Sequence, residues 1–470
     1  MKNILIICED FVSSNMGGVG IRYWELARVL ARHCKVSLLV PNETDLVSEE
    51  FKVIPYDRQK SDLRPFAEGV DVIILHGYVL HFHPYLLDLH IPFAVDLYVP
   101  HLFETLVSHA QDDFTEWLPA YCEYLRVQSE LLRAGDFFFC ASERQRDYWL
   151  GWLHAVNRIN PHTYQQDASL QKLITVVPYG IPNMPPRQQK HALKGVHPGI
   201  AEDDQLILWS GGLWNWLDPL TLIRAVAQLA EDHPRLKCYF MGTRHPNPIV
   251  NEHMTMPQQA MELAEQLGVL EKAVFFGNWV PYQERENYLV DADLSVMTHP
   301  NHIETRFAFR TRLLDSIWAK LPIIVTEGDA ISEWVERKNL GLTVPAGDVQ
   351  ALVKAIDNIL AAGGKAAFAS GFERVGSLLH WDKVAEPLVS FCLAPSQAAD
   401  KGHYMTDIER ISRDKDAFLQ QVIRDKDAFL EQVIHDKDAV IDDAYRQIER
   451  YRNSLPLRVY YRIKRLFRMK

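Results

Sequence analysis

Basic and acidic side chains gather in one polar segment, residues 301–312, and in the helix predicted to follow it. The segment contains Arg306, Arg310 and Arg312, and Asp315 lies about one turn into the helix. Guanidinium groups bind phosphate oxygens in pairs, and the free N–H groups at a helix start favour anions. The pattern predicts a diphosphate site at the helix start, with Asp315 accepting hydrogen bonds from ribose hydroxyls. A solvated charged loop is the alternative.

A glycine-rich segment, residues 15–20, lies between the first predicted strand and a helix. Gly18 and Gly20 would let the backbone approach a ligand, and the helix start behind them favours an anion. A tight glycine turn without a ligand explains the pattern equally well. The spacing is not G-x-G-x-x-G, and no suitably placed acid follows the second strand. A dinucleotide-dependent oxidoreductase is therefore disfavoured.

These segments sit in a chain whose short apolar strands alternate with helices up to about residue 395. The predicted strands are residues 3–8, 35–40, 70–75, 93–96, 137–141, 173–178, 206–210, 238–241, 274–276, 294–297 and 323–325. Long helices are predicted between them, for instance over residues 21–33 and 103–134. Such alternation predicts βαβ units with parallel sheets.

A stretch rich in proline and glutamine, residues 181–190, predicts a linker between two doubly wound α/β domains. The first domain is predicted over residues 1–185 and the second over residues 186–375. A helix over residues 376–398 is expected to cross back to the first domain. Because ligands bind at the carboxyl ends of parallel strands, the cleft between the domains is the expected site.

Beyond residue 400 the sequence repeats with a period of eleven, and the repeats are predicted to form a helix over residues 405–453. Apolar residues recur at spacings of four and seven, and eleven residues make three turns, which predicts a nearly straight or slightly right-handed supercoil. The helix would be about 70 Å long. Self-association as a coiled coil is favoured over a helix folded back on the preceding domains.

The last segment, residues 455–470, carries six Lys or Arg side chains and no acid, whereas the whole chain has a net charge of −11. Its apolar side chains share one helical face, which suits a helix lying on an anionic membrane surface. A disordered basic tail, or one that binds RNA, is the alternative.

Composition excludes several classes of protein. A net charge of −11 disfavours a nucleic-acid-binding protein, which should carry a basic face. The six cysteines never form C-x-x-C, which argues against a zinc site and fits a reducing cytosol. No apolar run approaches the roughly 20 residues of a membrane span, and the apolar N-terminal run is too short for a signal peptide. We therefore expect a cytoplasmic protein.

The ordered series of motifs resembles family 4 glycosyltransferases of the GT-B fold over residues 1–395. The matching segments are residues 17–20, 141–143, 176–181, 209–213, 276–281, 291–293, 315–322, 325–333 and 381–386. The resemblance implies transfer of a sugar from a nucleotide-sugar with retention of anomeric configuration, without a cofactor or metal. The leaving diphosphate would be stabilised by cations and helix dipoles.

The resemblance also assigns roles to residues of the second domain. Asp315 matches the ribose-binding carboxylate, and the backbone around Val280 matches the turn that holds the nucleobase. Gly211 and Gly212 open the second domain in the expected place. Gly18 and Gly20 match the glycine loop of the first domain.

The chain departs from the family pattern in its charged residues. A glutamate is usual eight positions before the matched Asp315, but Phe307 stands there, and the nearest acid is Glu304. The usual Arg and Lys of the diphosphate clamp are replaced by Gly212 and Leu217. We expect three arginines to take over the clamp. These are Arg310 and Arg312, with Arg306 as a lesser candidate.

The expected role of these arginines predicts the effect of one substitution. Without a cation, two phosphate charges would be uncompensated in a cleft. Arg310→Ala should therefore reduce turnover far more than it perturbs folding.

Other candidates have equally good structural explanations. Asp96 ends a predicted strand and is a candidate to contact the sugar or the acceptor, or to cap a helix. The histidines at positions 76, 81 and 83 suggest a metal site, but no acid-rich pattern supports one. Trp214 and Trp216 can stack on a sugar or base, or pack in the core.

The sequence therefore predicts a retaining, metal-independent glycosyltransferase whose acceptor is a glycan or a lipid-linked glycan, as in bacterial surface polysaccharide assembly. It would sit on the cytoplasmic face of the inner membrane. A catalytically inactive GT-B-like scaffold of a glycan-assembly complex is the main alternative. Another GT-B enzyme, such as an epimerase or a phosphorylase, is a second, although no lysine is identifiable for pyridoxal phosphate.

Overall fold

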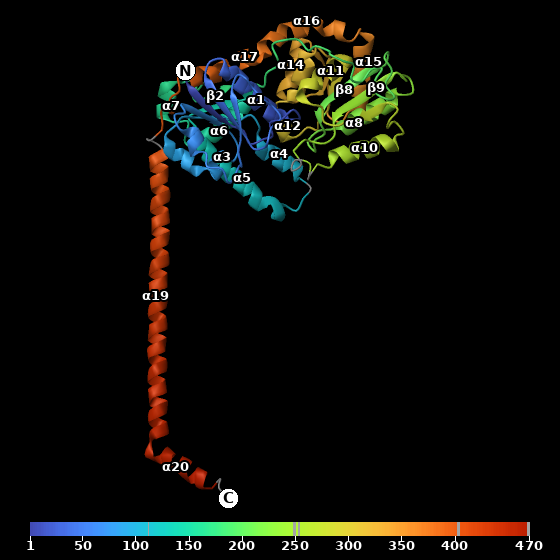
Figure 1. The fold of residues 1–470 in the computed structure, drawn as a ribbon. Coiled ribbons are helices and arrows are strands. Elements are labelled where there is room, and N and C mark those ends of the chain that lie inside the picture. Colours follow the sequence, from blue (N-terminus) through green and yellow to red (C-terminus); the bar gives the residue numbers. More distant parts are fainter. Residues whose placement is uncertain (111, 248–250, 252–253, 402–404, 468–470) are drawn as a thin grey trace. The chain divides into compact units, whose positions relative to one another are not determined.

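The computed structural model describes residues 1–110, 112–247, 251, 254–401 and 405–467, without the side chains of residues 405–414, 416, 417, 420 and 455. By its internal contacts the chain divides into two units, Met1–Lys401 and Gly402–Lys470. The first unit is an α/β structure with two sheets, and the second is helical (Figure 1). The fold class predicted from the sequence, two doubly wound α/β domains, is confirmed for the first unit.

The first sheet has seven parallel strands among the described residues, in the order β3-β2-β1-β4-β5-β6-β7. Its strands are β1 (Asn3–Ile7), β2 (Lys35–Val40), β3 (Lys52–Pro55), β4 (Val72–Leu75), β5 (Phe93–Asp96), β6 (Phe137–Cys140) and β7 (Ile174–Val176). The interior strands β4 and β6 are buried along their whole length, which matches their continuous apolar sequences VIIL and FFFC. Strands covered by helices on both faces require such sequences.

The connections of the first sheet are helical. They are α1 (Gly18–Ala31), α2 (Arg64–Ala67), α3 (Val79–Phe82), the 3₁₀ helix η1 (Pro84–Leu89), α4 (His101–Ser108), α5 (Phe114–Ala134), α6 (Glu143–Ala155) and α7 (Pro161–Gln166). The single helix predicted over residues 103–134 is wrong, because α4 and α5 are separate. Asp113 accepts a hydrogen bond from the backbone N–H of Thr115 and so starts a new helix.

The second sheet has six parallel strands within the same described ranges, in the order β10-β9-β8-β11-β12-β13. They are β8 (Gln205–Gly212), β9 (Leu236–Gly242), β10 (Val274–Phe276), β11 (Leu294–Met297), β12 (Ile323–Thr326) and β13 (Gly341–Val344). The helices are α8 (Pro219–Leu229), α10 (Met256–Gln266), η2 (Tyr282–Glu284), α11 (Arg285–Asp291), α12 (Ile303–Phe307), α13 (Thr311–Trp318), α14 (Ala330–Lys338), α15 (Val349–Ala361) and α16 (Lys365–Gly376).

After α16 the chain returns to the first sheet through η3 (Ser377–Leu379), α17 (Trp381–Val384) and α18 (Glu386–Leu393). The ring of Phe391 stacks on Phe137 of β6, with 4.5 Å between ring centroids. Further along, the Asp400 carboxylate forms a fully buried ion pair with the Arg158 guanidinium at 2.7 Å. The return segment is therefore fixed to the first domain by both apolar and ionic contacts.

The second unit consists of α19 (Met405–Asn453) and α20 (Leu455–Leu466). Figure 1 draws α19 as one uninterrupted helix, and this confirms the helix predicted over residues 405–453. Most of its described apolar side chains are exposed, including Phe418 and Phe429 at 67% each. None of the helices in the described residues is both long and apolar enough to cross a membrane.

Candidate functional site

A cavity of about 590 Å³ lies in the first unit at the carboxyl ends of both sheets. One wall is formed by the loops after β1, β4 and β5, and the other by the ends of β8 and β9 and the loop after β10. The first turns of α1 and α13 complete it. Of the predicted site residues, seven line this cavity: Gly18, Gly211, Gly212, Val280, Arg310, Arg312 and Asp315.

Two helix starts face each other across the cavity. A Cβ atom added to Gly18, the first residue of α1, would lie 3.7 Å from the hydroxyl oxygen of Thr311, the first residue of α13. Next to it, Gly17 packs so tightly against the His245 ring that a Cβ there would lie 2.4 Å from Nε2. The glycine segment thus permits close contact between the domains, and two positive helix ends point at one space.

Arg312 projects into this space and, among the described residues, has no carboxylate as an ion-pair partner. Its Nη1 donates to the Gly212 carbonyl at 2.7 Å, and its guanidinium lies over the Trp214 ring at 5.6 Å. In the part of the chain that the structure describes, Arg312 makes no ion pair. Burial and the neighbouring Arg310 lower the pKa of Arg312, so an anion placed there would relieve an unfavourable environment.

Arg310 also lines the cavity, but its charge is already paired. Its Nη1 and Nη2 donate to the two carboxylate oxygens of Glu304 at 3.0 and 2.7 Å. Glu304 is buried and does not line the cavity. Burial raises the pKa of Glu304, and Arg310 opposes that rise. Arg310→Ala would leave this carboxylate buried and unpaired, so we now expect that variant to lose stability as well as turnover.

Asp315 reaches the cavity from α13 and is held by a cation that the sequence analysis missed. Its Oδ1 accepts from the Arg285 Nε at 3.2 Å. The Arg285 guanidinium is sandwiched by aromatic rings, 3.8 Å from the Tyr282 centroid and 4.6 Å from that of Trp318. Burial raises the pKa of Asp315, and Arg285 counteracts it. Among the described residues only Oδ1 has a hydrogen-bond donor, so Oδ2 could accept from a ligand hydroxyl in the predicted ribose role.

Glycine and aromatic residues shape the second-domain wall. Gly211 has φ +105°, a conformation that favours glycine, and a Cβ there would meet the Arg312 Nε at 2.8 Å. Trp214 and Trp216 stack on each other with centroids 5.5 Å apart, and both line the cavity. Leu217, at a position where the family usually has lysine, is buried in the same wall.

The turn around Val280 joins the two domains. The indole N–H of Trp279 donates to the Met16 carbonyl, and the backbone N–H of Tyr282 donates to the Ser14 carbonyl at 2.8 Å. The Tyr282 hydroxyl donates to Glu25 of α1. The predicted base-binding turn is therefore fixed against the glycine segment.

Two predicted site residues are structural. The Asp96 carboxylate accepts hydrogen bonds from Nε and Nη2 of Arg22 at 2.7 and 3.2 Å, and both side chains are buried. Asp96 does not line the cavity. These contacts favour the structural role that the sequence left open for Asp96 over contact with the sugar or the acceptor. Gly20 also lies outside the cavity, because it packs against the Phe11 carbonyl, where a Cβ would clash at 2.2 Å.

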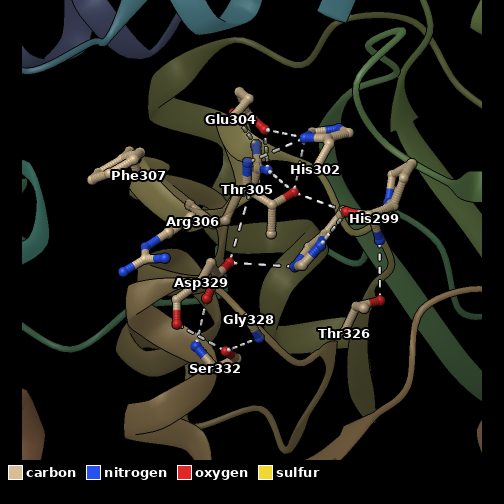
Figure 2. Close-up of polar contacts among 12 residues, drawn as sticks. His299, His302, Glu304, Thr305, Arg306, Phe307, Thr326, Gly328, Asp329 and Ser332 are labelled. Atoms are coloured by element: carbon tan, nitrogen blue, oxygen red, sulfur yellow. Dashed lines mark hydrogen bonds and ion pairs between the residues drawn. The ribbon is translucent and has the colours of Figure 1, made fainter.

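Arg306 and Phe307 are directed away from the cavity. Arg306 is exposed, and Figure 2 shows its side chain pointing away from Glu304 and His302. Phe307 stacks on Phe103 of α4 with 5.2 Å between centroids. The position that usually carries glutamate thus supports contact between the domains instead, and Arg306 is not placed to bind a diphosphate.

The first-domain wall carries charged residues that the sequence analysis did not single out. Glu9 follows β1, and its carboxylate accepts from the Arg58 Nη2 at 3.1 Å and from the Tyr78 backbone N–H. The Glu9 backbone N–H in turn donates to His76 Nε2 at 3.1 Å. Glu9 and Asp10 follow the carboxyl end of β1, and this position in the sequence is the signal that could have identified them as site residues.

The histidines considered for a metal site have other roles. His76 is an acceptor for Glu9, His81 faces Glu123, and His83 pairs with the Tyr85 hydroxyl. Across the described ranges, no group of three or more His, Cys, Asp or Glu side chains is placed to hold a metal ion.

Comparison with known proteins finds a family likeness in the second domain and a likeness of fold over the first unit. Residues 204–362, which span the second sheet and most of its helices, match the family model described as "Glycosyl transferases group 1". Among solved structures, the sucrose-phosphate synthase of Thermosynechococcus elongatus superposes with a TM-score of 0.59 at 18% identity, covering 83% of this chain and 98% of that one. The predicted resemblance to family 4 glycosyltransferases is confirmed.

Other GT-B structures agree. WaaG, a glycosyltransferase involved in lipopolysaccharide biosynthesis, gives a TM-score of 0.56 at 17% identity, with 84% of this chain and 100% of that chain covered. HepE of Anabaena, solved with UDP and glucose, gives 0.58 at 14% identity with the same coverage. At these identities the likeness establishes the GT-B fold. A comparison with curated protein sequences finds no significant match.

Proposed function

We propose that this GT-B glycosyltransferase transfers a sugar from a nucleotide-sugar to a hydroxyl of a glycan or lipid-linked glycan, with retention and without a metal. The observation that carries the proposal is Arg312, a cation without a carboxylate partner among the described residues, at the start of α13 in the inter-domain cavity. The start of α1 faces the same space. Together they suit a diphosphate leaving group.

The cavity offers a place for each part of such a donor. The diphosphate would lie against Arg312 and the two helix starts, and the ribose hydroxyls would donate to Asp315. The base would lie on the turn at Val280, near Trp279. The reacting sugar would then face Glu9 and Asp10 of the first domain, where the acceptor enters. The structures of HepE with UDP and glucose support a nucleotide-sugar for this fold.

Charge stabilisation by Arg312 would replace a metal in this reaction. As the bond between sugar and diphosphate breaks, negative charge grows on the phosphate oxygens, and a fixed cation stabilises the transition state more than the ground state. Retention follows from the family resemblance. Transfer in the presence of EDTA would support metal independence. A product whose anomeric NMR signal matches the configuration of the donor would support retention.

The donor itself is found by a thermal-shift screen of the full chain against UDP-, GDP-, ADP- and dTDP-sugars. A ligand present at 100 times its Kd should add about 2.7 kcal/mol to the free energy of unfolding. If none of these compounds raises the Tm, the proposed donor class is wrong.

Two arginine variants then test the site. Arg312→Gln should weaken nucleotide affinity at least about tenfold, which corresponds to about 1.4 kcal/mol. Arg306→Gln is the matched control, because Arg306 is exposed and does not line the cavity. Equal affinity in the two variants would contradict the assignment.

The same proteins discriminate the main alternative, an inactive scaffold of a glycan-assembly complex. An enzyme should slowly hydrolyse or transfer the sugar of the donor found in the screen, and Arg312→Gln should lower that rate. Nucleotide binding with no turnover on any glycan acceptor would favour the scaffold.

We also propose that α19 associates with copies of itself. Its exposed apolar side chains follow the eleven-residue repeat: Phe418, Leu419, Val422, Ile423, Phe429, Leu430, Ile434, Val440 and Ile441. One helix cannot bury such a stripe, and identical repeats match each other in register. Phe429→Glu should lower the mass measured by sedimentation velocity, whereas Arg424→Glu, on the opposite face, should not. A monomeric wild-type chain would refute self-association.

The basic helix α20 is proposed to bind the cytoplasmic face of the inner membrane. Val459, Ile463 and Leu466 are exposed on it, together with four described Lys or Arg side chains. Each basic side chain near an anionic surface adds about 1 kcal/mol. The chain should co-sediment with vesicles containing phosphatidylserine and not with pure phosphatidylcholine. Arg462→Glu combined with Arg465→Glu should abolish the difference.

A further inference from the structure

A buried cluster of charged side chains lies behind the cavity, at the ends of β11 and β12. His299 and Asp329 are fully buried, and Figure 2 shows them facing each other. Nε2 of His299 lies 3.5 Å from Oδ2 of Asp329. The Arg310 Nε lies 3.8 Å from the same oxygen. Arg310 therefore lies between two carboxylates, Asp329 and its bidentate partner Glu304.

The neighbours of His299 define its protonation state. Its Nδ1 is 3.3 Å from the Pro300 carbonyl, and its Nε2 faces the Asp329 carboxylate, so both ring nitrogens face oxygen acceptors. A neutral imidazole has one N–H, and only the imidazolium can donate on both sides. His302 differs, because its Nδ1 accepts from the backbone N–H of Thr305.

Charge balance gives the same assignment. Asp329 and Glu304 contribute two negative charges, and Arg310 contributes one positive charge. Burial and Arg310 lower the pKa of His302, which keeps that ring neutral. Among these four contacting groups a charged His299 supplies the second positive charge, and an uncompensated buried charge is costly. Arg312 and Glu104 act on Arg310 and Glu304 from outside this group.

The Asp329 carboxylate behaves as a paired anion. Burial by itself would raise the pKa of Asp329, but His299, Arg310 and the Ser332 backbone N–H hold it below its usual range. Its Oδ1 accepts a hydrogen bond from that N–H at 2.6 Å, and Asp329 thereby caps the start of α14.

We infer that His299 is a positioning residue that carries a proton on both ring nitrogens. Its positive charge neutralises Asp329, so that Glu304 is the one carboxylate left to pair with Arg310. Arg310 lies behind the place proposed for the diphosphate of the donor. This inference rests on the proposed function, because it assigns a consequence for donor binding. The charged groups that face His299 are Asp329 at the start of α14 and Arg310 at the start of α13. Behind them lie His302 and Glu304 at α12, and Glu104 of α4 acts on Glu304.

Four proteins test the inference: the wild type, His299→Gln, Asp329→Asn and the double variant. The probe is whichever of UDP, GDP, ADP or dTDP binds the wild type, and its Kd is measured by calorimetry. His299→Gln leaves one net negative charge behind the site and should weaken binding about tenfold. Adding Asp329→Asn removes that charge, so the double variant should bind within about twofold of the wild type.

A purely structural role for His299 predicts the opposite pattern, because the double variant would then be at least as weak as His299→Gln. That result, or wild-type affinity in His299→Gln, would overturn the inference. His33→Gln, on the exposed surface, is the matched control. Asp329→Asn keeps the side-chain cap of α14 and should bind like the wild type.

A spectroscopic measurement separates this inference from the proposed function. In full-length protein labelled with ¹⁵N-histidine at pH 7, both ring nitrogens of His299 should give imidazolium shifts. The signal is assigned by its loss in His299→Gln or, if that variant does not fold, by its change in Asp329→Asn. A neutral tautomer would overturn the charge assignment even if nucleotides bind. Imidazolium shifts without nucleotide binding would instead reject the proposed donor.

Discussion

Buried ion pairs distinguish the charged residues that stabilise the fold from the charged residues that are available to bind a ligand. Arg22 is bidentate to Asp96, and Arg22 also donates to the carbonyls of Val177 and Pro178 at the end of β7. Arg312 has no such partner in the described residues and projects into the cavity. At the scale of single residues, pairing is therefore a better guide to function than charge alone.

Asp96→Asn should destabilise the protein strongly. It leaves the Arg22 guanidinium buried without a counter-charge, a change that costs about 3–5 kcal/mol. Denaturant titration measures this loss, and the nucleotide affinity of the protein that remains folded should be unchanged. Asp62→Asn, in the exposed pair with Arg64, is the control and should have no measurable effect. A stable Asp96→Asn protein with weakened nucleotide binding would restore the site role predicted from sequence.

His76 predicts a pH dependence of stability. Burial, then His101 and Arg58, lower the pKa of His76 from 6.5 to about 3. A depressed histidine pKa stabilises the fold fully above about pH 6.5, and this contribution is lost as the pH falls towards 3. The free energy of unfolding should fall by up to about 1.4 kcal/mol per pH unit. Denaturant titrations from pH 7 to 5 should show this slope in the wild type and a smaller one in His76→Gln. Parallel slopes would contradict it.

The sequence predicted the second-domain part of the site well and the first-domain part poorly. Arg312 and Asp315 lie in one helix, so a local pattern places them together. The pairs Arg22–Asp96 and Arg285–Asp315 join residues far apart in the sequence, and only the folded chain shows which charges are neutralised.

At the scale of elements, α12 links the two domains. Phe307 stacks on Phe103 of α4 and lies 5.2 Å from the Tyr148 ring of α6, and its carbonyl accepts from Gln145. Nearby, Arg144 pairs with Glu333 of α14. We expect this contact to affect how the two walls of the cavity are held together.

Phe307→Ala should reduce turnover more than nucleotide affinity. The residues expected to hold the nucleotide are in the second domain, whereas the lost contact holds the domains together. We expect a kcat about tenfold lower and a Kd within about twofold. Steady-state kinetics and calorimetry measure both. Exposed Leu378→Ala is a control of similar chemistry. A larger change in Kd than in kcat would contradict this role.

The segment after α18 anchors the end of the first unit. The Asp400 carboxylate is buried against Arg158, and the Ala398 N–H donates to Asp136. Arg158 also donates to carbonyls at the end of α5, including Gly135.

Truncations test this anchor directly. A chain ending at Lys401 should keep the Tm of the first unit. A chain ending at Leu393 should lose about 3–5 kcal/mol, because Arg158 stays buried without its carboxylate. Differential scanning calorimetry compares the two. Equal thermal stability would show that the pair contributes nothing.

Most strand positions and most helices followed from apolar periodicity, because buried parallel strands have continuous apolar sequences. The break at Asp113 and the short strands β3 and β13 were missed. Asp113 lies inside an otherwise helical pattern, and the local signal for a cap is one residue. Strand β3, Lys52–Pro55, is too short and too polar to stand out.

At the scale of the whole molecule, the chain joins a GT-B unit to a repetitive helical unit with a basic end. The first unit contains the cavity, and the second has an exposed apolar stripe on α19. These two features, the apolar stripe of α19 and the basic end in α20, are the basis of the proposals that α19 self-associates and that α20 binds a membrane.

Arg312 and the two helix starts are proposed to hold the diphosphate of the donor. A crystal structure of the full chain with the nucleotide selected by the thermal screen would show where the phosphates bind. We expect phosphate oxygens within hydrogen-bonding distance of the Arg312 guanidinium, between the first turns of α1 and α13. Phosphates bound elsewhere, or an Arg312 that still contacts only the Gly212 carbonyl, would contradict this proposal.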